Sequence, residues 1–116
     1  MTSLAHSLIE RVIKQRDLVQ SMTEETRSIS VRVTSRDRSV SAEVDGLGSL
    51  TGLWLGPPAT RLDADALAKL IVDTAQEAAR MAMERYAFLM QEFTTRMEEL
   101  QKAPLTRWDG TVVQPE

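Results

Sequence analysis

The stretch from Ser39 to Pro58, SVSAEVDGLGSLTGLWLGPP, constrains the fold more than any other part of the chain. Its first seven residues alternate between polar and apolar side chains, which is the period of a half-buried strand. Asp45-Gly46 then favours a chain reversal, and Gly48 indicates a looser turn with a bulge. The returning run 49–55 stops at Gly56-Pro57-Pro58, because proline lacks the backbone donor that a strand needs. The pattern predicts a β-hairpin with defined ends.

A two-stranded hairpin is only marginally stable in water, so the flanking segments must cover it. Residues 28–34 alternate in the same way and predict a strand that precedes the hairpin. Residues 3–26 and 63–102 carry apolar side chains at helical spacing, and the second stretch contains neither Gly nor Pro. The sequence therefore predicts an α+β fold of order α-β-β-β-α. In it, a three-stranded antiparallel meander, with strands at 28–34, 39–45 and 49–55, is packed by both helices.

At 116 residues the chain has room for one modest core, so we expect a single domain over 1–103 and a flexible tail over 104–116. Trp108, which belongs to this tail, could dock elsewhere on the chain. The second helix is too long for three strands to cover. Its far half must contact either the first helix or the same helix of another chain. A small core and a long helix together predict a homodimer.

The composition excludes several classes of function. There is no cysteine and only one histidine, His6, so disulfides, thiolate metal sites and histidine metal clusters are all excluded. No group of residues resembles a catalytic or cofactor site, so we expect neither an enzyme nor a cofactor. Asp63 and Asp65 are expected to cap a helix rather than to bind a metal. Charged residues interrupt the first apolar pattern and no run is long enough to span a membrane, which predicts a cytoplasmic protein.

The net charge is −3, yet positive charge gathers on the first strand and its loop. Nucleic-acid binding would therefore have to use a local patch. Four arginines stand there against a single aspartate, and Arg11 and Lys14 of the first helix are further candidates. The candidate DNA-binding residues are Arg27, Arg32, Arg36, Arg38, Arg11 and Lys14. The alternative is an ordinary solvated loop in which Arg32 pairs across the strands with Glu43.

Apolar side chains give a second candidate surface. If Thr51, Leu53 and Leu55 face the core, Trp54 and Leu50 form a patch on the outer side of the sheet. Exposed aromatic patches often mark interfaces, although a neighbouring segment could equally cover this one. The candidate partner-interface residues are Trp54, Leu50, Tyr86, Leu89 and Phe93.

The predicted element order, together with the run VSAEVDGLGSLTGLWLGPPATRLDADALAKLIVDTAQEAARMAMER, resembles the YbaB/EbfC family of nucleoid-associated proteins. The shared pattern is an alternating strand, an Asn/Asp-Gly turn, a strand that ends in a small apolar pair before Asp-Pro, an acidic helix start and an Ala-rich amphipathic helix. The run Leu-Thr-Gly-Leu-Trp-Leu is especially similar to the actinobacterial branch, some members of which accompany type VII secretion systems. In two places the chain departs from the pattern: Gly56 replaces an acidic residue, and Trp54 replaces a polar or basic one.

The resemblance implies a homodimer that binds duplex DNA with little sequence preference, in the cytoplasm and at the nucleoid. Our first hypothesis is accordingly a DNA-binding protein that contacts backbone phosphates. The competing hypothesis is a secretion-associated adaptor or chaperone-like module that holds a protein partner. An enzyme is a third hypothesis, for which no residues can be named.

Overall fold

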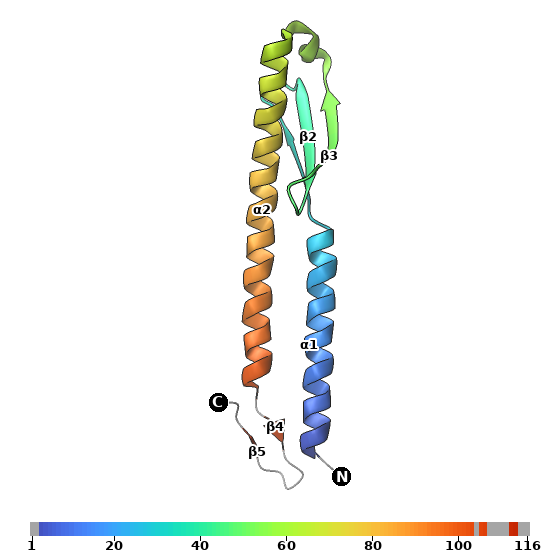
Figure 1. Cartoon of the computed structure of the whole chain (residues 1–116), viewed down its shortest axis with the longest axis vertical. Coiled ribbons are helices and arrows are strands. Elements are labelled where there is room, and N and C mark those ends of the chain that lie inside the picture. Colours follow the sequence, from blue (N-terminus) through green and yellow to red (C-terminus); the bar gives the residue numbers. More distant parts are fainter. Residues whose placement is uncertain (1–2, 104, 107–111, 114–116) are drawn as a thin grey trace. The chain divides into compact units, whose positions relative to one another are not determined.

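The computed structural model describes residues 3–103, 105–106 and 112–113. Figure 1 shows the elements in chain order. They are α1 (Ser3–Arg27), β1 (Ser30–Thr34), β2 (Val40–Asp45), β3 (Leu50–Leu55), the 3-10 helix η1 (Pro57–Arg61), α2 (Ala64–Lys102), β4 (Leu105–Thr106) and β5 (Val112–Val113). The predicted α-β-β-β-α order is confirmed. Each predicted strand begins one or two residues too early, and η1 was not predicted. Trp108 lies outside the described residues.

The chain divides into two compact units. One comprises Met1–Glu24 with Leu89–Glu116, and the other is Glu25–Phe88. The long helix α2 contributes its first part to the unit that contains the sheet and its last part to the unit that contains most of α1. The far half of α2 therefore shares a unit with most of α1, which is one of the two partners predicted for it.

The three strands form an antiparallel sheet in the order β1-β2-β3, with β2 in the centre. The inward side chains of β2, Val40, Ala42 and Val44, are all essentially inaccessible to solvent. The buried residues of α2 recur every four positions and therefore lie on one face of the helix: Thr74, Ala78 and Ala82. Because two of these three are alanines, the helix can approach the sheet closely.

A bulge shifts the register of β3. Val40 pairs with Leu55 and Ala42 with Leu53, but Val44 pairs with Leu50, so that Thr51 is the extra residue. The Thr51 hydroxyl donates to the carbonyl oxygen of Glu43 at 3.2 Å.

This bulge makes one prediction wrong. Paired residues lie on the same face of a sheet, so Leu50 and not Thr51 shares the inner face with Leu53 and Leu55. Leu50 therefore does not form an outer patch with Trp54. Strict alternation fails here because the bulge adds one residue to β3 and reverses the side on which every earlier residue points.

In the unit that contains α1, one candidate DNA-binding residue has a structural role. The Arg11 guanidinium donates to the carbonyl oxygen of Ala103 and, at 3.4 Å, to that of Gln101. The last carbonyl groups of a helix lack partners within the helix, and a cation is favourable at this end. Arg11 therefore caps the C-terminus of α2.

Candidate nucleic-acid interface

The connection between β1 and β2 is a tight and well-bonded turn. The amide of Arg38 donates to the carbonyl of Ser35 at 3.0 Å, and the amide of Ser35 donates to that of Val40 at 2.8 Å. Arg38 has a φ of 62°, in the left-handed region that costs a residue with a side chain roughly 1–2 kcal/mol. The turn therefore holds Arg38 in a conformation that it would not adopt alone.

Asp37 organises the inside of this turn. One carboxylate oxygen, Oδ1, accepts from the Ser39 hydroxyl at 2.7 Å, the Ser35 hydroxyl at 2.8 Å and the Ser39 amide at 3.0 Å. These bonds favour the ionised form, so the pKa of Asp37 lies below its usual value, with the Ser39 hydroxyl as the largest cause. The negative charge of Asp37 is thereby directed into the turn.

The Asp37 network predicts a specific pH dependence. Since its pKa is lowered by folding, ionised Asp37 stabilises the protein above about pH 4, and this contribution is lost as the pH falls through the lower folded value. Asp37→Asn should therefore be less stable than the native chain at pH 7. The difference between the two should be smaller at pH 3 than at pH 7, as measured by urea denaturation at both pH values. A difference in stability that stays the same at the two pH values would contradict the role assigned to the carboxylate.

Arg36 and Arg38 are exposed on this turn. In the described part of the chain neither guanidinium has an ion-pair or hydrogen-bond partner. They differ in this from Arg32 and Arg11, whose guanidiniums are both engaged. Arg36 and Arg38 are thus free side chains on a turn held by backbone hydrogen bonds.

The segment after β3 returns to the same end of the sheet. The Gly56 amide donates to the Ser39 carbonyl at 2.8 Å, and a side chain at position 56 would collide with the Arg38 carbonyl oxygen. This contact explains why glycine stands where the resemblance leads one to expect an acidic residue. The helix η1 follows and ends at Arg61, an exposed residue that the sequence analysis missed.

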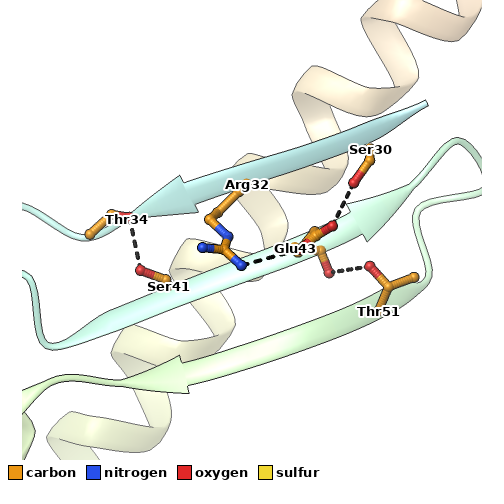
Figure 2. Close-up of polar contacts among 6 residues, drawn as sticks. All are labelled: Ser30, Arg32, Thr34, Ser41, Glu43 and Thr51. Carbon is orange, nitrogen blue, oxygen red and sulfur yellow. Dashed lines mark hydrogen bonds and ion pairs between the residues drawn. The ribbon is translucent and has the colours of Figure 1, made fainter. Parts of the chain in front are cut away.

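The outer face of the sheet carries two groups of hydrogen-bonded polar side chains, which Figure 2 shows turned away from α2. Glu43 accepts from the Ser30 hydroxyl at 2.6 Å and from the Arg32 guanidinium at 3.5 Å, while Thr34 and Ser41 share a hydrogen bond of 2.8 Å. The predicted pairing of Arg32 with Glu43 is confirmed.

Trp54 completes this face. The Arg32 guanidinium carbon lies 3.7 Å from the centre of the Trp54 ring, which is a cation–π contact. The ring also occupies the space that a side chain at Gly52 would need. Trp54 is 44% exposed, but Arg32 and Gly52 both contact its ring. It is part of a stack within the sheet rather than half of an apolar patch with Leu50.

The remaining predicted residues lie elsewhere. Arg27 and Tyr86 line a pocket of about 320 Å³ with Thr26, Asp45, Gly46 and Leu47. The Asp45 carboxylate in that pocket already accepts from the amides of Leu47 and Ser49, both at 3.0 Å. Lys14 is exposed, and Leu89 and Phe93 are partly buried, all three in the unit that contains α1. The predicted residues are therefore divided between the two compact units.

Comparison with known protein families gives a match over most of the chain. The YbaB/EbfC DNA-binding family matches residues 3–97. This range includes α1, the whole three-stranded sheet and all of α2 except its last five residues. The chain belongs to the YbaB/EbfC DNA-binding family. No curated protein matches it.

Membership of the YbaB/EbfC family agrees with the resemblance drawn from the run that starts at Val40. The exposed arginines are therefore candidates for contact with DNA. In the described residues, neither α1 nor α2 is both long and apolar enough to cross a bilayer.

Proposed function

We propose that this chain is a homodimeric nucleoid-associated protein that binds duplex DNA through backbone phosphates with little sequence preference. The observation that carries the proposal is the turn between β1 and β2, where Arg36 and Arg38 are exposed and unpaired on a support held by Asp37. Arginine binds phosphate oxygens through a rigid, planar set of donors. Phosphate contacts fix a protein on DNA but carry no base information, which favours broad binding in the nucleoid without catalysis.

The exposed edge of the sheet supports the homodimer. Leu50, Leu53 and Leu55 lie on the inner face of β3, yet they are 50%, 41% and 54% exposed. β3 is also an edge strand, with one side unpaired in the described sheet. A second copy that covers this edge would remove the leucines from water, which is the main favourable contribution to association.

A titration of a fluorescent mixed-sequence duplex, followed by anisotropy, tests the proposal. At about 50 mM salt we expect a Kd in the micromolar range or tighter, weakened at least about tenfold at 200 mM salt because bound counterions are released. Light scattering in the same buffers should give twice the mass of one chain.

The variant that tests the role of the turn is Arg36→Ala with Arg38→Gly, in which glycine keeps the left-handed conformation of residue 38. It should remain folded and bind more weakly, with a shallower dependence on salt. Failure of the folded native protein to bind duplex DNA at low salt would exclude this function.

A further inference from the structure

We infer that the phosphate-binding surface is one end of the sheet, formed jointly by the turn 35–38 and by η1, and that Arg61 is its third cation. This inference rests on the DNA binding proposed above and specifies where the DNA is held. Of the cations predicted from the sequence, it retains Arg36 and Arg38 and adds a residue from a different element.

The backbone holds the two elements side by side. Gly56 donates to the Ser39 carbonyl at 2.8 Å and packs against the Arg38 carbonyl without room for a side chain. Ala59 is buried, and its amide donates to the Gly56 carbonyl at 3.0 Å. Pro57 and Pro58 restrict φ at the start of η1. The backbone at Arg61 is therefore fixed relative to the turn before any ligand arrives, which lowers the entropy cost of binding.

Two of the three acidic groups at this end, those of Asp37 and Asp63, are already engaged, whereas Asp65 in the first turn of α2 is exposed and has no partner in the described residues. Asp37 accepts three hydrogen bonds inside the turn, and Asp63 accepts from the Ala66 amide at 2.7 Å as the cap of α2. This cap confirms the capping role that the sequence predicts for Asp63. In the described part of the chain, neither carboxylate pairs with Arg36, Arg38 or Arg61.

Two other arginines, Arg80 and Arg32, are less available to a phosphate. Arg80 contacts both Glu77 and Glu84, and Arg32 is held by Glu43 and Trp54. A phosphate would have to displace a carboxylate from either of them. At Arg36, Arg38 and Arg61 it would displace only water and counterions, which is the reaction that gives DNA binding its salt dependence.

Single substitutions at Arg36 and Arg61 test the inference, with Arg85→Ala as a matched control. Arg85 is also exposed and has no partner in the described residues, but it lies within α2. We expect Arg36→Ala and Arg61→Ala each to weaken duplex binding about threefold to tenfold at 50 mM salt. Each should also reduce the slope of log Kd against log salt by about one per protomer. Arg85→Ala should change the Kd by less than about twofold.

The outcomes separate this inference from the proposed function. Urea denaturation first establishes that each variant is as stable as the native chain. Native protein that does not bind duplex DNA at low salt would overturn both proposals. Native protein that binds, with Arg61→Ala unaffected and Arg85→Ala or Lys14→Ala weakened, would overturn the assignment to this end of the sheet and leave the proposed function in place.

Discussion

Replacing Gly56 with alanine should lower the free energy of unfolding by about 3 kcal/mol, near the upper end for overpacking. The added methyl group would overlap the carbonyl oxygen of Arg38. That oxygen belongs to the backbone of a turn whose next residue, Ser39, accepts the Gly56 amide at 2.8 Å. The collision therefore cannot be relieved without breaking this hydrogen bond. Urea denaturation followed by circular dichroism measures the loss, at one fixed protein concentration because self-association would shift the midpoint.

Gly52→Ala is the matched control for this substitution. Here the new methyl group would meet the ring of Trp54, a side chain that can rotate away. We expect a change of less than about 1 kcal/mol in stability. Displacement of the ring from Arg32 should also alter the fluorescence of Trp54, measured in a Trp108→Phe background. Equal losses of stability at positions 52 and 56 would contradict the distinction between a backbone and a side-chain collision.

Replacing Ala78 with leucine should destabilise the protein by about 3 kcal/mol. Ala78 is fully buried on the face of α2 that also carries Thr74 and Ala82. A larger side chain would push the helix away from the sheet, and the contacts made by the neighbouring buried residues would be lost with it. The measurement is again urea denaturation at fixed protein concentration.

Ala68→Leu provides the comparison, because residue 68 is exposed on the same helix. The same change of residue there should alter the free energy of unfolding by no more than about 0.5 kcal/mol. If both leucine variants were equally stable, the close approach inferred for α2 would be wrong.

The strands were predictable because their alternation is local, and Asp45-Gly46 marks the reversal between β2 and β3. The face of Leu50 was not, because counting in twos assumes that no residue is added to a strand. Gly48 led us to place a bulge in the turn, whereas the extra residue is Thr51 inside the strand. Its neighbour Gly52 could have indicated this position, since glycine inside a strand often accompanies a bulge.

The candidate site was harder to predict because charge along the sequence does not show what each cation contacts. Arg11, Arg32 and Arg36 were equally good candidates for DNA binding in the sequence. In the structure, however, Arg11 caps α2 and Arg32 stacks on Trp54. Arg61 was missed because the charge count ended at Arg38. The double proline could have been taken as the sign of a return toward the end of the sheet.

The composition of β3 also affects how the protein behaves at high concentration. Its six residues, LTGLWL, carry no charge, and they form an edge of the described sheet with three partly exposed leucines on one face. Uncharged edge strands of high β-propensity act as templates for aggregation when they are left uncovered. Pro57 and Pro58 follow one residue after the strand and limit the length of chain that can join such an aggregate. The strand that would join two protomers is therefore also the segment through which the protein would aggregate.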